Sequence, residues 1–249
     1  VVPESSETLG IGKTVIYTAT ASEVMSADTS MSITLSNSVT VTLTVVADTP
    51  TTLAGTYTIS ADDDVDDLTI TAYRALTAED LSGNSLSTTT DIGDITGSGT
   101  QGIAVEATAP TAEILASGHT YNASTGVLTL AASELSTMGA EDGANVKAQV
   151  DMTKLSWDIN QSGSNLETFT NDDVTSIIQT SSDVLTITFT TAKTAELAGT
   201  TDLGGQSSNL DGLDIAEGFL NDNAGNASEQ TAVNNAEVAM SDTAAPTLS

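Results

Sequence analysis

Four stretches of the chain alternate between apolar and hydroxyl-bearing residues with a period of two. This is the pattern of a β-strand that buries one face. Two of the stretches are rich in threonine, valine and isoleucine, at residues 39–46 and 184–189. The other two end in Ser-Glu, at residues 17–23 and 128–134. The pattern predicts an all-β protein.

The same sequence marks occur twice, in the same order. A strand ending in Ser-Glu is followed by an alternating strand and Leu-Ala-Gly-Thr, then by Asp-x-(Ser/Ala)-Gly-Asn, and finally by an acid four residues before a proline. The marks lie at 22–23, 53–56, 80–84 and 106–110 in the first copy and at 133–134, 197–200, 222–226 and 242–246 in the second. Repetition of four marks in order predicts two copies of one unit.

The repeat divides the chain into domain 1, residues 1–107, and domain 2, residues 108–249. Domain 2 is longer, and we place its insertion at about residues 138–171. Trp157, the only tryptophan, lies in this insertion. We expect an extra hairpin or short helix that packs the indole ring inward, in preference to a ring exposed for stacking on a ligand.

The repeat is cut inside a first strand. Domain 2 begins at Pro110-Thr111 with a predicted strand at 112–115, whereas domain 1 lacks Ala-Pro-Thr, which occurs instead at 245–247. The sequence then represents one period of a longer covalent array, or a subunit that joins copies of itself head to tail. In the second case residues 245–249 would complete the neighbour's sheet by strand addition. A chain cut at arbitrary boundaries is the third interpretation.

Charge restricts the possible partners. The chain has 34 acidic and 5 basic residues, for a formal net charge of −29. This charge excludes nucleic acid and anionic membranes as partners, and no apolar stretch approaches the roughly 20 residues that span a bilayer. The chain has no cysteine. Outside the cell its stability would therefore rest on packing, strand hydrogen bonds or metal ions.

These marks resemble the bacterial immunoglobulin-like repeats of surface-layer proteins and large adhesins. Such repeats carry Ser-Glu after the second strand, an Asp-x-Ala-Gly-Asn loop and an Asp-x-x-Ala-Pro linker. The resemblance covers nearly the whole chain except the insertion, with Ser82 in place of alanine and Glu106 in place of aspartate. It implies two tandem immunoglobulin-like β-sandwich domains at the cell surface, with calcium at the domain junctions.

Sandwich geometry would bring three segments together at each junction. The second strand returns to the end where the chain enters, and the loop before the last strand lies at the same end. Calcium binds six to eight oxygen ligands, and a bound ion would neutralise carboxylates that otherwise repel one another. The expected ligands are Glu106, Glu134, Asp222 and Asn226 inside the chain, and Glu23, Asp80 and Asn84 with Asp242 of a neighbouring repeat.

Two further interpretations of the acidic residues remain open. The Asp-x-x-Gly-Asn loops can be Asx-type turns that hold no metal. The acidic run at 62–67 is a further metal candidate through Asp62, Asp64 and Asp66, although a solvated acidic loop explains it too.

The sequence predicts a structural protein and no enzyme. The single histidine, His119, is expected to lie exposed in a loop, and the chain has no nucleophile elbow, phosphate-binding glycine loop or zinc-spaced histidine cluster. We therefore expect a repeat or subunit of an extracellular fibre or surface layer, stiffened by calcium. The alternative is an adhesin module that binds a surface or host ligand through loops of domain 2.

Overall fold

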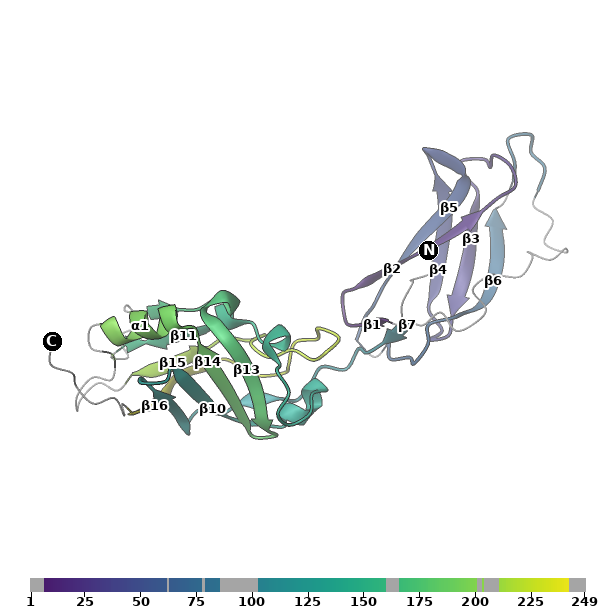
Figure 1. Cartoon of the computed structure of the whole chain (residues 1–249). Coiled ribbons are helices and arrows are strands. Elements are labelled where there is room, and N and C mark those ends of the chain that lie inside the picture. Colours follow the sequence, from purple (N-terminus) through teal and green to yellow (C-terminus); the bar gives the residue numbers. More distant parts are fainter. Residues whose placement is uncertain are drawn as a thin grey trace. The chain divides into compact units, whose positions relative to one another are not determined.

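The structure is a computed structural model of the whole chain, shown in Figure 1. It describes residues 7–61, 63–77, 79–85, 103–159, 166–200, 203 and 211–241. The chain divides into two compact units, Val1–Thr108 (unit 1) and Ala109–Ser249 (unit 2), and each unit is described by itself.

Unit 1 is built from β-strands. The strands are β1 (Glu7–Leu9), β2 (Thr14–Thr20), β3 (Ser30–Leu35), β4 (Thr40–Val46), β5 (Thr49–Thr58), β6 (Ile70–Thr77) and β7 (Ile103–Val105). Five of them form an antiparallel sheet in the order β2-β5-β4-β3-β6. The remaining two, β1 and β7, pair in parallel.

Period-two alternation gives this sheet one buried face. In β4, Val41 and Leu43 are buried while Thr40, Thr42 and Thr44 are exposed. Successive side chains of a strand point to opposite faces, so the two apolar residues reach the core and the three hydroxyls reach solvent. The core of unit 1 also contains Ile33, Leu35, Tyr57, Ile59, Leu68 and Val105.

Unit 2 is also mostly β. Its strands are β8 (Glu113–Ile114), β9 (His119–Asn122), β10 (Val127–Ser133), β11 (Leu155–Asp158), β12 (Leu166–Thr168), β13 (Val174–Ser181), β14 (Val184–Phe189), β15 (Gly212–Ile215) and β16 (Val233–Ser241). They hydrogen-bond in the order β12-β11-β15-β16-β9-β10-β14-β13, and β8 pairs with β10. All ladders are antiparallel except the one between β16 and β9.

Aromatic contacts show that the sheet of unit 2 folds over on itself. Tyr121 of β9 and Trp157 of β11 are separated by two strands in the sheet order, yet their ring centroids lie 5.1 Å apart, edge to face. Phe189, at the end of β14, contacts Tyr121 at 6.2 Å. The two halves of the sheet therefore pack face to face around these rings.

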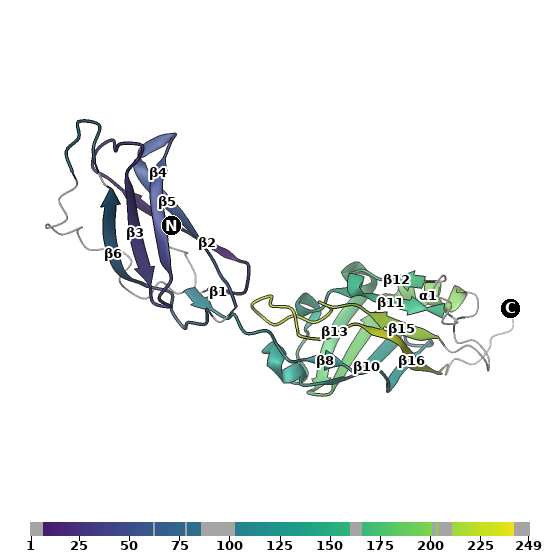
Figure 2. The ribbon, with the colours of Figure 1, turned by 180° about the vertical axis from the view of Figure 1, so that it is seen from behind.

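Short helices cover the ends of unit 2. The α-helix α1 (Thr191–Gly199) lies beside β11 and β12 in both views (Figures 1 and 2). Its first turn is capped by the Thr190 hydroxyl, which accepts from the backbone N–H of Lys193. The 3₁₀ turns are η1 (Leu135–Met138), η2 (Lys147–Gln149), η3 (Met152–Lys154) and η5 (Asn171–Asp173).

The two units have several strand pairs in common. The last strand pairs in parallel with an early strand in both, as β7 with the first strand β1 in unit 1 and β16 with the second strand β9 in unit 2. The antiparallel pairs β2–β5, β4–β5 and β3–β6 of unit 1 correspond to β10–β14, β13–β14 and β11–β15 of unit 2. In unit 1 the strand β4 also pairs with β3, whereas in unit 2 the added strand β12 occupies that edge of β11.

A strand is present at each of the four predicted stretches, but β2 ends at Thr20, so Ser22-Glu23 lies beyond the strand and not at its end as predicted. The stretch 184–189 is β14, and 39–46 forms β4. The stretch 128–134 lies in β10, but the strand ends at Ser133 because Glu134 takes a left-handed conformation with φ of 53°. Within the insertion, β11 and β12 pair antiparallel, and the expected inward packing of Trp157 is confirmed by its 0 % exposure.

One of the four repeat marks is not structurally equivalent in the two units. Leu-Ala-Gly-Thr at 53–56 lies in β5, whereas the same letters at 197–200 form the end of α1 and the residue after it. An alternating strand precedes the mark in both copies, as predicted, but the two strands are not equivalent: 39–46 forms β4, whose counterpart in unit 2 is β13, whereas 184–189 is β14. Four residues carry too little conformational preference to resist their surroundings, because packing overrides propensity.

Candidate functional site

The two Asp-x-x-Gly-Asn loops have the same backbone structure. The N–H of Asp80 donates to the carbonyl of Asn84, and that of Asp222 donates to the carbonyl of Asn226, both at 3.0 Å. Their glycines, Gly83 and Gly225, take φ of 81° and 87°, a region open to glycine and unfavourable for other residues. The glycine in this motif is therefore required by the turn itself.

The aspartate of each loop is held by the asparagine four residues later. In unit 1 the Asn84 backbone N–H donates to Asp80 Oδ1 at 2.8 Å, and the Asn84 side-chain amide donates to Asp80 Oδ2 at 2.7 Å. The same two bonds join Asn226 to Asp222, each at 2.8 Å. Both carboxylate oxygens are thus used inside the turn, as the metal-free alternative requires.

These hydrogen bonds hold Asp80 in its charged form. The pKa of Asp80 lies below its usual range, chiefly because the Asn84 side-chain amide donates to it, with help from the Asn84, Ser82 and Gly83 backbone. Hydrogen bonds to a carboxylate favour the ionised state. The Asn84 amide turns its nitrogen toward Asp80, so that this pair does not form a common set of oxygen ligands.

The two turns differ in burial. Asp222 and Asn226 are 8 % and 3 % exposed, whereas Asn84 is exposed. In unit 2 the Asn223 side chain donates to the carbonyl of Gly139, just after η1, at 2.8 Å. The turn of unit 2 is therefore packed against its own domain.

Three of the expected segments meet at one end of unit 2. The Thr111 hydroxyl donates to Glu134 Oε2, and the N–H of Glu229 donates to the carbonyl of Pro110 at 3.1 Å. Together with the contact between Asn223 and Gly139, these bonds bring the entering chain, the end of β10 and the turn to the same end. Glu134, Asp222 and Asn226 come from these segments, but the Glu134 carboxylate is engaged by Thr111.

A similar meeting occurs in unit 1. Met25 forms an isolated bridge with Asp80, and the N–H of Ser26 donates to the carbonyl of Glu79 at 2.8 Å. The segment that follows Glu23 therefore runs beside the turn, while the Glu23 side chain itself is exposed.

The acidic run ties down the chain where it leaves unit 1. Asp64 accepts from the Ala107 backbone N–H and from the Thr108 hydroxyl, the latter at 2.8 Å. Glu106 accepts from the Thr108 N–H at 3.2 Å. Asp66 is exposed. Asp64 thus anchors residues 107–108 to the rest of unit 1, whereas the Glu106 bond is local to this segment; the sequence predicted neither role.

In the described part of the chain, no cluster of metal ligands accompanies these turns. Among the residues that the structure describes, no three His, Cys, Asp or Glu side chains are grouped so that they could hold a metal ion. Asp62, Asp242 and the segment 245–249 lie outside the described residues. Calcium at these sites stays a prediction.

The expectation of an exposed His119 is wrong. This residue is 1 % exposed, its Nδ1 accepts from the N–H of Ala131 at 3.1 Å, and its Nε2 is 2.9 Å from the carbonyl of Leu115, to which it donates in the matching tautomer. The ring thus hydrogen-bonds both to Leu115, in the segment between β8 and β9, and to Ala131 of the neighbouring strand β10. Burial lowers the pKa of His119, partly offset by the bond to Leu115.

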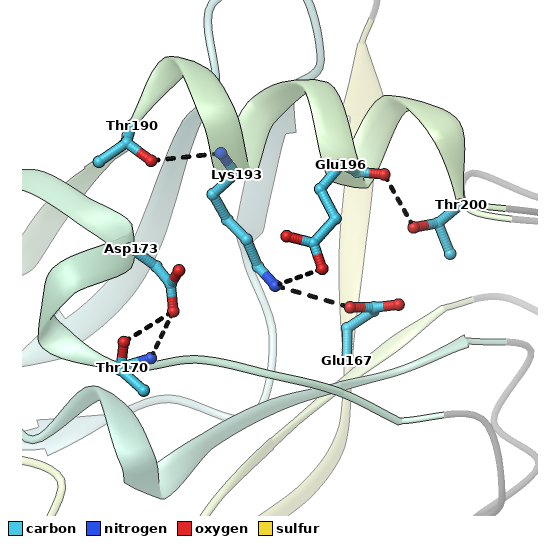
Figure 3. Close-up of polar contacts among 7 residues, drawn as sticks. All are labelled: Glu167, Thr170, Asp173, Thr190, Lys193, Glu196 and Thr200. Carbon is cyan, nitrogen blue, oxygen red and sulfur yellow. Dashed lines mark hydrogen bonds and ion pairs between the residues drawn. The ribbon is translucent and has the colours of Figure 1, made fainter.

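One lysine of unit 2 is buried, which no pattern in the sequence indicated. Lys193 of α1 is 5 % exposed, with its ammonium 3.2 Å from Glu196 and 3.6 Å from Glu167 (Figure 3). The ammonium also lies 5.1 Å from the centre of the Phe169 ring. Two carboxylates and an aromatic face compensate the buried charge, which fastens α1 to β12 and indicates a structural role.

No protein-family model matches the chain, and no curated protein matches it. In the part of the chain that the structure describes, no helix is both long and apolar enough to cross a membrane.

Proposed function

We propose that this chain is a non-enzymatic structural module of an extracellular fibre or surface layer, which joins copies of itself head to tail. The observation that carries the proposal is the direction of the strands at the two ends of each unit: β1 pairs in parallel with β7, and β9 with β16. The first strand of unit 2, β8, runs in the same direction as β9, because both are antiparallel to β10. Because these strands run in the same direction, each unit is entered at one end and left at the other. Units with this path link into a line without a long return connection.

The strand pairs of unit 2 support an immunoglobulin-like sandwich. In that fold the strands A, B, E and D form one sheet and C, F and G the other. The group β8, β10, β14 and β13 has the first arrangement, and β11, β15 and β16 have the second. Unit 1 shares the corresponding pairs, so we assign it the same ancestry.

A covalent pair of chains tests the linear array. Two copies joined from Ser249 to Val1 in one polypeptide should unfold at the same temperature as the single chain, and the maximum dimension from small-angle scattering should nearly double. A compact particle with an almost unchanged maximum dimension would contradict the proposal.

Deletion of residues 245–249 tests how separate subunits would join. If this segment adds a strand to the neighbour, the full chain should form linear polymers with rising concentration while the shortened chain stays monomeric in sedimentation velocity. Replacement of the segment by Gly-Ser residues of equal length is the control for chain length. Polymerisation of the shortened chain would exclude strand addition.

Calcium is a separate part of the proposal. Glu134, Asp222 and Asn226 come from segments that meet at one end of unit 2, but the carboxylates accept hydrogen bonds from Thr111 and Asn226. With their carboxylates accepting these hydrogen bonds, Glu134 and Asp222 fit a metal-free turn better than a calcium site. An ion at this end would have to displace the Asn226 amide.

The adhesin module is the second candidate, and the insertion bears on it. The described part of the insertion contributes Val146, Val150, Met152, Leu155, Trp157 and Phe169 to the core of unit 2. These buried residues build the domain, and Leu166, 46 % exposed, is the large apolar side chain that the described part of the insertion leaves at the surface. The insertion therefore favours the structural role.

A further inference from the structure

The five-stranded sheet of unit 1 is free of acidic residues. None of the residues of β2 to β6 is Asp, Glu or Lys, and Arg74 is the one charged side chain among them. Elsewhere the chain carries 34 acidic residues. In unit 2, by contrast, five strands each carry one acidic residue. These residues are Glu113, Asp158, Glu167, Asp214 and Glu237.

The outward positions of this sheet form rows of hydroxyls. Thr14 pairs with Thr58, and Ile16 with Thr56, across β2 and β5. On the next strands Ser32 pairs with Thr42 and Thr34 with Thr40. We call these outward positions of β2 to β6 the threonine face; its exposed members are Thr14, Ile16, Thr18, Thr20, Thr40, Thr42, Thr44, Thr56, Thr58, Ala72 and Arg74. Figures 1 and 2 show the strands side by side in one layer.

We propose that the threonine face packs against the same face of a second copy of this chain. Two molecules with a formal charge of −29 repel one another wherever carboxylates face carboxylates. The threonine face is the larger of two sheet surfaces whose strands carry no acidic residue; the other consists of the adjacent strands β9, β10, β14 and β13 of unit 2. A hydroxyl both donates and accepts, so a hydroxyl surface is complementary to itself, as a two-fold symmetric contact requires.

The size of the face indicates a weak contact. Strands are about 4.8 Å apart and rise about 3.3 Å per residue, so five strands of about seven residues cover roughly 550 Å². Two copies would bury roughly 1,100 Å², near the lower limit for a specific interface. Ile16, 53 % exposed, adds the one large apolar side chain. Such a contact becomes strong only when many copies are linked, as in lateral packing of neighbouring fibres.

Charge substitutions at the centre of the face test the proposal. Thr42 is exposed on the middle strand, and a like charge there meets its own copy across a two-fold contact. Both Thr42→Glu and Thr42→Lys should therefore weaken dimerisation by about tenfold or more, a loss of about 1.4 kcal/mol. The matched control is Thr175→Glu on β13 of unit 2, which is also exposed and should dimerise like the unmodified chain.

Sedimentation equilibrium of the full chain at high salt measures the effect, because salt screens the general repulsion. Unfolding curves establish that all variants fold. A closed dimer separates this contact from head-to-tail joining, which would give open-ended growth. Equal dimerisation of the Thr42 and Thr175 variants would overturn the proposal. So would stronger association of Thr42→Lys, which would identify an acidic surface as the partner, or a monomer at millimolar concentration.

Discussion

His119 shows how burial changes the chemistry of a single residue. Its ring lies inside unit 2 and accepts a hydrogen bond from Ala131, which only an unprotonated Nδ1 can do. Protonation would replace this acceptor with a donor that faces the Ala131 N–H, in a site with little access to water. The structure therefore requires the neutral ring.

The stability of unit 2 should consequently depend on pH. The pKa of His119 is lower in the folded chain than the 6.5 of a free side chain, so the unfolded chain binds the proton more readily. The stabilisation is complete above pH 6.5 and is lost as the pH falls below that value. Urea unfolding at pH 7.5 and 5.5 should show a larger loss for the unmodified chain than for His119→Gln. Equal losses would contradict the assignment, since the carboxylates are common to both.

The two equivalent turns should respond differently to loss of the asparagine. In Asn226→Ala the buried Asp222 loses its side-chain donor, which should lower the free energy of unfolding of unit 2 by about 1–3 kcal/mol. Asn84→Ala removes the same bond at an exposed turn, where water replaces it, and should cost much less. Chemical denaturation of both variants measures the difference. Equal effects would show that burial of the turn is unimportant.

At the scale of elements, one tetrapeptide forms a strand and a helix end in the same chain. In β5, an added Cβ on Gly55 would lie 2.5 Å from the carbonyl oxygen of Thr42, so the close approach of β4 requires glycine. At the end of α1, no atom lies within 4 Å of a Cβ added to Gly199. Buried Leu53 and Leu197 anchor the two copies in different cores.

Alanine at the two glycines should therefore act in opposite directions. Gly55→Ala should destabilise unit 1 by about 1–3 kcal/mol, because the new methyl group must displace backbone. Gly199→Ala should be neutral or stabilise unit 2 by up to about 1 kcal/mol, since alanine is the better helix former. Thermal and urea unfolding of the two variants provide the test. A stable Gly55→Ala would show that β4 and β5 can separate without cost.

For the whole molecule, the main question is whether cations hold the ends of the units. With −29 charges, any ion bound only by the folded chain must raise its stability by mass action. If calcium binds as the sequence predicts, excess chelator should lower the melting temperature by several degrees and change the scattering profile. Magnesium at equal ionic strength is the control for screening. Unchanged melting and scattering would leave the Asp80 and Asp222 turns as metal-free turns.

The sequence by itself determined the local features. Period-two alternation located β4, β10 and β14, and the Asp-x-x-Gly-Asn motif located two turns with the same hydrogen bonds, because strand faces and tight turns depend on neighbouring residues. The order of these marks also indicated two related units, whose strand pairs correspond.

Only the tertiary structure decided what depends on distant residues. The burial of His119 results from the interruption between β8 and β9 opposite β10, and the ion pair of Lys193 with Glu167 joins α1 to β12, which lie apart in the sequence. Leu-Ala-Gly-Thr became strand or helix according to the core it joined, and the Asp-x-x-Gly-Asn turn became buried in unit 2 while Asn84 in unit 1 stays exposed. Each of these outcomes depends on burial and long-range hydrogen bonds, which no local pattern encodes.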